Sequence, residues 1–310
     1  MLRLISTVGV LILFQGCASS LQYYSLVDET PARFSEPGLV SQVPFFPQDE
    51  YQCGPSALAT VLGASKMDVT PEALVPLVYV PERQGSFQLE MVATARSFGR
   101  LAYQIPPTLE SLFMEIQNGH PVLVLQNLGL NRFPHWHFAV VKGFDIDRRR
   151  VTLNSGRIED HEMSLVAFER TWIRADYWAI VVLEPGSIPA SADPTRYFHS
   201  VVALERNNPP ELVLPAYRVG LERWPGQREL LMGQGNLLYS ADRLEEARGI
   251  FETIIAEHPE YGPAHNNLAH IHLDQGRQEL AEEFAAQAVA LGGIYLEQFL
   301  DTQQAIQSNR

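Results

Sequence analysis

The stretch VPFFPQDEYQCGPSALATVL, residues 43–62, decides how the first half of this chain folds. Its Gly54-Pro55 pair opens an apolar helix, because proline suits the first helical turn, where its missing N–H costs no hydrogen bond. Cys53 therefore lies at the start of that helix. Unpaired backbone N–H groups and the positive end of the helix dipole favour a thiolate there over a thiol. The stretch predicts a nucleophilic cysteine.

The composition is that of a folded, acidic protein. Its 310 residues suffice for about two domains, and 46% hydrophobic with 19% charged residues exclude a disordered polyelectrolyte. The formal net charge is −13, and only Lys66 and Lys142 are lysines. Such a chain cannot assemble a Lys/Arg-rich face for gripping phosphates, which argues against nucleic acid as a partner.

The N-terminus is typical of a secretion signal. Arg3 supplies a positive charge, residues 4–14 are apolar, and Gly16-Cys17 follows as a small-residue processing site. This end resembles a bacterial lipobox, which implies a signal peptide over 1–17 and a lipid on Cys17. An ordinary cleaved signal or an uncleaved anchor is the alternative. With Ala18 next, we expect an outer-membrane lipoprotein facing the periplasm of the cell envelope. If Cys17 carries lipid, Cys53 has no disulfide partner within the chain.

The middle of the chain predicts an α+β domain over 41–184. Helical patterns come first, and short β-rich runs follow at 122–125, 138–141, 151–153 and 179–183, which favours an antiparallel sheet. Residues 18–40 are polar and irregular, and we expect them to form a tether. Residues 185–195 are rich in proline and serine, as in a linker between domains.

The last part of the chain, 196–310, predicts a helical repeat. Pro225 and Pro259 are 34 residues apart, and so are Ala247 and Ala281. This period resembles tetratricopeptide repeats, whose small residues let antiparallel helices approach closely. A generic helical bundle is the alternative. Such an array would offer a groove for a protein partner, and the excess of acidic residues favours a basic one.

A thiol hydrolase also needs a base far along the chain and a group that orients it. His137 opens the apolar run Phe138-Ala139-Val140-Val141, which predicts a histidine at the start of a strand. His135 is the competing base. Asn154 ends the next predicted strand, where it could orient the imidazole. Gln48, just upstream of the cysteine, could donate to an oxyanion.

These residues resemble the bacteriocin-processing, double-glycine branch of the papain-type cysteine peptidases over 43–183. The resemblance implies a papain-like fold, with Cys53 as nucleophile, His137 as general base and acid, and Gln48 as oxyanion donor. The chain departs from the pattern in two places. The spacing from Gln48 to Cys53 is one residue shorter than usual, and Asn154 stands where this branch usually has aspartate.

We therefore expect a lipid-anchored cysteine peptidase that acts on a peptide or protein and recruits a protein partner through its repeats. No organic cofactor or metal is implied. His265, His270 and His272 lie on one repeat helix, but they lack a further ligand at metal-binding spacing. The alternative is a catalytically inactive, peptidase-like adaptor in which Cys53 and His137 only pack.

Overall fold

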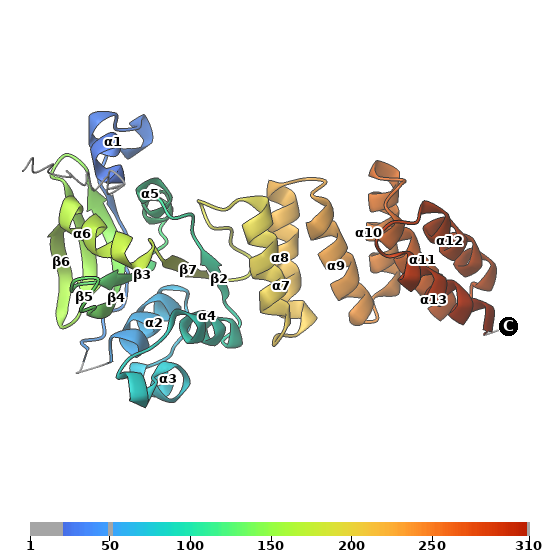
Figure 1. Cartoon of the computed structure of the whole chain (residues 1–310), viewed down its shortest axis with the longest axis horizontal. Coiled ribbons are helices and arrows are strands. Elements are labelled where there is room, and N and C mark those ends of the chain that lie inside the picture. Colours follow the sequence, from blue (N-terminus) through green and yellow to red (C-terminus); the bar gives the residue numbers. More distant parts are fainter. Residues whose placement is uncertain (1–20, 49–51, 309–310) are drawn as a thin grey trace, which may run out of the picture.

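The computed structural model describes residues 21–48 and 52–308 and divides into a sheet-containing domain and a row of helices (Figure 1). The N-terminal α+β domain with an antiparallel sheet, followed by a helical repeat region, confirms the predicted fold class.

One antiparallel sheet of seven strands forms the centre of the first domain, in the order β2-β7-β3-β4-β5-β6 with β1 paired to β4. Its strands are β1 (Gly38–Leu39), β2 (Leu101–Gln104), β3 (Val122–Asn127), β4 (Trp136–Asp145), β5 (Arg150–Ser155), β6 (Ile158–Ser164) and β7 (Ala179–Leu183). The polar residues 160–162 lie within β6, where Thr152 of β5 pairs with Glu162.

Both faces of the sheet are covered by helices, which explains why its central strands are apolar without interruption. In β4, Phe138 and Val140 join the core beneath one set of helices, whereas Ala139 and Val141 join the core on the other face. The first face is covered by α2 (Cys53–Ala64), α3 (Pro71–Val78) and α4 (Gln88–Ser97). The second is covered by α1 (Gln22–Asp28), α5 (Leu109–Gln117) and α6 (Leu165–Trp172).

Local signals start two of these helices. Pro71 occupies the first position of α3, after Thr70 at the N-cap. The side chain of Thr108 accepts a hydrogen bond from the Ser111 N–H at 3.0 Å and caps α5.

The repeat region is a row of antiparallel helices that extends away from the sheet (Figure 1). Its helices are α7 (Pro194–Glu205), α8 (Pro210–Arg223), α9 (Arg228–Ser240), α10 (Leu244–Glu257), α11 (Gly262–Asp274), α12 (Gln278–Leu291) and α13 (Leu296–Ser308). A Cβ at Gly235 would lie 2.7 Å from the Phe251 ring, so α9 and α10 can approach this closely only with glycine. Ala247 and Ala281, 34 residues apart, are both fully buried.

The two domains share one core, and the expected linker is docked rather than loose. Helix α7 packs on β2, and one cluster of buried side chains runs from the sheet through α7 into the repeats. The fully buried carboxylate of Glu115 accepts hydrogen bonds from Ala190 N at 3.1 Å, Ser191 N at 2.8 Å and Ser191 Oγ at 2.5 Å. It also contacts His120 Nδ1 at 2.7 Å. Residues 185–195 therefore include groups that hydrogen-bond to Glu115 and hold this segment on the peptidase domain.

Residues 21–40, expected to be a tether, also pack on the domain. Glu169, buried beneath α1, accepts hydrogen bonds from Gln22 N at 2.6 Å and Tyr23 N at 2.8 Å. Phe34 is 1% exposed and meets Phe113 edge to face. Among the described residues, no helix has both the length and the apolar character needed to cross a membrane.

Candidate active site

Cys53 is the first residue of α2 and is half-buried at the margin of the sheet. Burial raises the pKa of its thiol above the ordinary value of 9.0, because the thiolate loses solvation. Backbone N–H groups of Phe138, Gly54 and Cys53 itself oppose this shift by hydrogen bonding to the sulfur. The bond from Phe138 places the sulfur beside the residue that follows His137.

His137 is the second residue of β4, where it pairs with Gln126 of β3. Its Nε2 lies 2.9 Å from Ser155 Oγ, the last residue of β5. Burial, and to a smaller extent the nearby charge of His135, lower the pKa of the imidazole to about 4. With Nε2 engaged by Ser155, Nδ1 is the ring nitrogen left for another partner.

Ser155, rather than Asn154, makes the hydrogen bond to His137. The register pairs Val140 with Asn154, so the Asn154 side chain belongs to the face of Val140. Because successive side chains of a strand alternate, Ser155 falls on the opposite face, together with Ala139 and His137. The expected orienting residue is therefore displaced by one position. The alternation of Val151, Leu153 and Ser155 along the strand assigns Ser155 to this face, but only the pairing of β5 with β4 brings it to His137.

Asn154 instead holds the segment that leads to the nucleophile. Its buried side chain donates from Nδ2 to Pro44 O at 3.3 Å and accepts at Oδ1 from Asp160 N at 3.4 Å. Asp160 in turn pairs with Lys142 Nζ at 2.8 Å, and the Lys142 side chain is 5% exposed. Asn154 thus ties the chain around Pro44 to the β5–β6 hairpin.

The backbone of Gln48 is fastened to the same hairpin. Gln48 N–H donates to Gly156 O at 3.1 Å, and Arg157 Nε donates to Gln48 O at 3.3 Å. These bonds hold the Gln48 backbone against Gly156 and Arg157, the two residues that follow Ser155. Among the described residues, no hydrogen bond of the Gln48 side chain accompanies them, so its oxyanion role remains a prediction.

His135, the competing base, is exposed and lies in the connection between β3 and β4. Its backbone N–H donates to Asn127 Oδ1 at 2.9 Å. Arg174 Nη1 secures the same connection by donating to Asn127 O at 3.2 Å and Gly129 O at 2.7 Å. The sequence offered no indication of this anchoring arginine, since it lies 45 residues beyond Gly129. Among the described residues, the His137 side chain has a polar partner in Ser155, and none is found for the His135 side chain.

The pKa directions define the resting state of the pair. At neutral pH a thiol whose pKa is raised is protonated, and an imidazole with a pKa of about 4 is neutral. Because Ser155 is uncharged, it orients the ring but cannot stabilise imidazolium as a carboxylate would. The arrangement suits proton transfer from sulfur to His137 during attack, rather than a standing thiolate–imidazolium pair.

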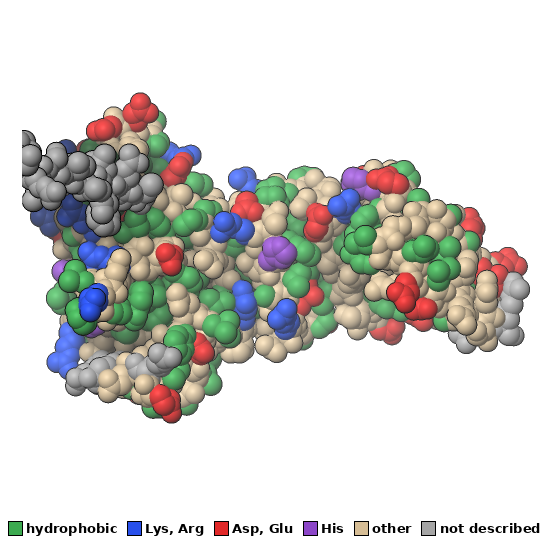
Figure 2. Space-filling view, in the orientation of Figure 1, with side chains coloured by type: hydrophobic (Ala, Val, Ile, Leu, Met, Phe, Trp, Pro, Cys, Tyr) green, Lys and Arg blue, Asp and Glu red, His purple; other side chains and the backbone are tan. Residues whose placement is uncertain are grey.

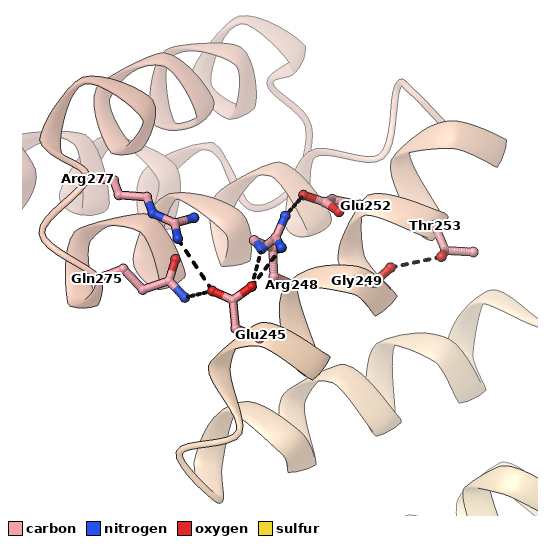
Figure 3. A network of polar contacts seen from close by, with 7 residues as sticks. All are labelled: Glu245, Arg248, Gly249, Glu252, Thr253, Gln275 and Arg277. Atoms are coloured by element: carbon pink, nitrogen blue, oxygen red, sulfur yellow. Dashed lines mark hydrogen bonds and ion pairs between the residues drawn. The ribbon is translucent and has the colours of Figure 1, made fainter.

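The repeat region carries no comparable nucleophile, and its charges hold helices together. Arg248 of α10 binds Glu245 at 2.7 Å and Glu252 at 2.6 Å (Figure 3). Glu245 also accepts from Gln275 Nε2 at 2.8 Å and pairs with Arg277 at 3.5 Å, so α10 is bound to the turn after α11 (Figure 3). Arg248, followed by the neighbouring Gln275 and Arg277, lowers the pKa of Glu245.

The histidines of the repeats have packing partners. His265 contacts Gln287 Oε1 at 2.9 Å and Pro259 O at 2.8 Å, while His272 stacks on Phe284. His270 contacts Thr302 at 3.1 Å. Over 21–48 and 52–308, no group of three or more His, Cys, Asp or Glu side chains is placed to hold a metal ion.

These features define a cysteine-peptidase-like domain joined to a helical repeat. Residues 40–180 match the Peptidase_C39 like family, and residues 203–261 and 232–293 match the tetratricopeptide repeat. The chain therefore consists of a C39-like peptidase domain followed by tetratricopeptide repeats. No curated protein matches it.

Several solved structures resemble parts of the chain. A candidate C39-like peptidase from Bacillus anthracis is 18% identical, with a TM-score of 0.41, over 48% of this chain and 98% of its own. A double-glycine-motif protease of an AMS/PCAT transporter, solved with its leader peptide, is 26% identical, with a TM-score of 0.36, over 47% and 92%. MamA from Desulfovibrio magneticus RS-1 is 18% identical, with a TM-score of 0.31, over 37% and 71%.

Proposed function

We propose that the chain is a cysteine peptidase in which Cys53 is the nucleophile, His137 the base and Ser155 the group that orients His137. The observation that carries the proposal is the position of Cys53 at the start of α2, hydrogen-bonded by Phe138 N–H, next to a histidine whose Nε2 is held by Ser155. The family match over 40–180 supports a peptide as substrate.

The reaction would be acyl transfer. Nδ1 of His137 takes the thiol proton while the Cys53 sulfur bonds to the carbonyl carbon of a peptide. The oxyanion receives hydrogen bonds from the Cys53 backbone N–H and, in this proposal, from the Gln48 side chain. Collapse breaks the C–N bond, and His137 returns the proton to the leaving amine. His137 then deprotonates water, which hydrolyses the thioester and restores the thiol.

Trapping the acyl-enzyme tests this function directly. Peptide libraries incubated with the wild-type chain should yield cleavage products, and a thiol-directed peptide warhead should label Cys53 alone, as seen by intact mass. Cys53→Ala and His137→Ala should both lose nearly all turnover, because members of a catalytic unit fail together. Arg170→Gln, a change at an exposed position on α6, serves as the control variant. Cleavage that persists in Cys53→Ala would overturn the proposal.

The repeats are proposed to recruit a protein partner or the substrate itself. The repeat match over 203–293 and the excess of acidic side chains support a partner with basic segments. The candidate catalytic groups all lie in the first domain, so we assign binding, and not bond cleavage, to the repeats. Affinity capture on the full chain, with and without 0.5 M salt as a rough test of charge dependence, checks this assignment.

We also propose lipid attachment at Cys17, which lies outside the described residues, and a place in the bacterial envelope, at the outer membrane facing the periplasm. Four residues separate Cys17 from Gln22 at the start of α1, so the two residues lie at most about 17 Å apart along an extended chain. A lipid there would hold the peptidase domain close to the bilayer. Labelling with a palmitate analogue should mark the wild type and spare Cys17→Ser; equal labelling of both would contradict lipidation.

A second candidate function is an inactive, peptidase-like adaptor. The observation that favours it is the uncharged residue behind His137, together with the raised pKa of Cys53 and the lowered pKa of His137. Thiol labelling separates the two functions. An adaptor's Cys53 should react with iodoacetamide equally in the wild type and in His137→Ala, whereas a catalytic pair should react more slowly once His137 is removed.

A further inference from the structure

A cavity of about 240 Å³ lies where the peptidase domain meets the repeats, between α4, β2 and α7. At ~30 Å³ per liquid water, it has room for a small ion and several waters. Its polar lining comes from both domains: Arg96 and Gln104 from the peptidase side, and Arg196, His199 and Ser200 from the repeat side. Of the described residues that line it, none is acidic.

Arg96 is the unbalanced charge in this cavity. Its Nε is buried without a hydrogen-bond partner, and no carboxylate among the described residues pairs with its guanidinium. Burial lowers the pKa of Arg96, and the nearby positive charge of Arg206 lowers it further. An arginine offers five donors and no acceptor, so only an anion or an acceptor group can satisfy it.

The side chains opposite Arg96 are also hydrogen-bond donors. Arg196 and His199 lie three residues apart on one face of α7. Asp193 binds Arg196 at 3.3 Å and offsets part of its charge, and the Ser200 hydroxyl donates to Arg196 O at 2.9 Å. The remaining groups, Arg96, His199 and the Gln104 amide, all have donors to offer.

The surface near this junction carries several cationic side chains. Figure 2 shows Lys/Arg side chains and a histidine over α7 and its surroundings, with Asp/Glu side chains among them. The neighbouring hollow of the junction differs, since Arg100 there is accompanied by Glu184 and Glu211. Of these two hollows, the one at Arg96 combines an arginine whose Nε lacks a hydrogen-bond partner with a lining that has no carboxylate among the described residues.

We propose that this cavity binds a small oxyanion, a phosphoryl or carboxylate group, held by Arg96 from the peptidase domain and by His199 and Arg196 from the repeats. Such an ion would supply the missing acceptor for Arg96 and would link the two domains. The Asn208 side chain already joins them here by donating to Arg96 O at 2.9 Å. A bound anion would add a second link between the domains beside this hydrogen bond.

Calorimetric titration of the full chain tests the site, at pH 7 and constant ionic strength set with chloride. One arm uses inorganic phosphate, and the other uses a short neutral peptide with a free C-terminal carboxylate against its amidated form. We expect saturable binding in at least one arm. Arg96→Gln should weaken it at least tenfold, because charge-assisted hydrogen bonds are lost, and His199→Gln should weaken it by a smaller factor.

The control is Arg170→Gln, which removes the same charge from an exposed position on α6 and should leave binding unchanged. Binding of phosphate alone assigns a phosphoryl ligand, and binding of the free-carboxylate peptide alone assigns a peptide terminus. Should Arg96→Gln fail to fold, exposed His199→Gln carries the test. No saturable binding in either arm, or equal weakening in Arg170→Gln, overturns the proposal.

Discussion

In the proposed peptidase, Ser155 determines how readily His137 accepts a proton. The hydroxyl fixes the ring through Nε2 but supplies no charge, and burial holds the pKa of His137 at about 4. His137 is protonated only below that pKa. Its capacity to accept a proton is therefore complete at neutral pH and is lost as the pH falls through about 4. We expect the acid limb of kcat/KM in the wild type near this value.

Ser155→Asp should move that limb upward. A carboxylate next to Nε2 stabilises imidazolium and raises the pKa of His137, by roughly 1–3 units for an opposite charge at close range. The same charge favours the thiolate of Cys53, so peptide turnover and alkylation at pH 7 should both increase. The pH profiles of kcat/KM and of iodoacetamide labelling measure the two effects.

Ser155→Asn is the matched control for this prediction. It changes the size of the side chain similarly without adding charge, so it should leave the acid limb near pH 4. An unchanged limb in a folded Ser155→Asp variant would show that Ser155 does not face the titrating nitrogen of His137.

At the scale of elements, Asn154 links the segment before the nucleophile to the β5–β6 hairpin. Asn154→Ala leaves Pro44 O and Asp160 N without their partner, at a cost of about 1–3 kcal/mol in the free energy of unfolding. Turnover should fall because Gln48 shifts, while the acid limb stays in place. Denaturant unfolding and the pH profile check the two halves of this prediction. A shift of the acid limb of kcat/KM in Asn154→Ala would show that Asn154, and not Ser155 alone, orients His137.

Glu115 likewise links two segments by buried hydrogen bonds, here α5 and the segment before α7. Glu115→Ala leaves the N–H groups of Ala190 and Ser191 unpaired in a buried place, and we expect unfolding to become easier by about 3 kcal/mol. Glu110→Ala on the same helix removes an exposed ion pair with Arg33 and should cost at most about 1 kcal/mol. Thermal or denaturant unfolding compares the two. Equal losses would contradict a special role for Glu115.

On the scale of the whole molecule, α7 and α8 belong to the peptidase domain as much as to the repeats. A chain that ends after Trp224 retains both helices, and it should fold and cleave short peptides. A chain that ends after Pro189 loses α7 from β2 and the bonds to Glu115, which exposes Leu101 and Tyr103. It should unfold at a lower temperature and lose activity in parallel. If the shorter chain matches the longer one in both respects, the shared core is not needed for stability.

The sequence by itself determined those features that depend on neighbours along the chain. Gly54-Pro55 starts a helix at Cys53, the apolar run after His137 forms a strand, and the 34-residue spacing of Ala247 and Ala281 produces a repeat. Each rests on local backbone preferences or on a period, which a reader of the sequence can count. The fold class and the two candidate reacting residues therefore came from the sequence.

Only the tertiary structure decided which distant groups meet. Register, and not sequence proximity, selects Ser155 over Asn154, because one step along a strand turns a side chain to the other face. Glu169 binds Gln22 across 147 residues and turns an expected tether into part of the domain. Arg96 meets Arg196 in a cavity between two domains. The physical reason is common to all three: long-range packing chooses the partners of polar groups, and no local pattern encodes that choice.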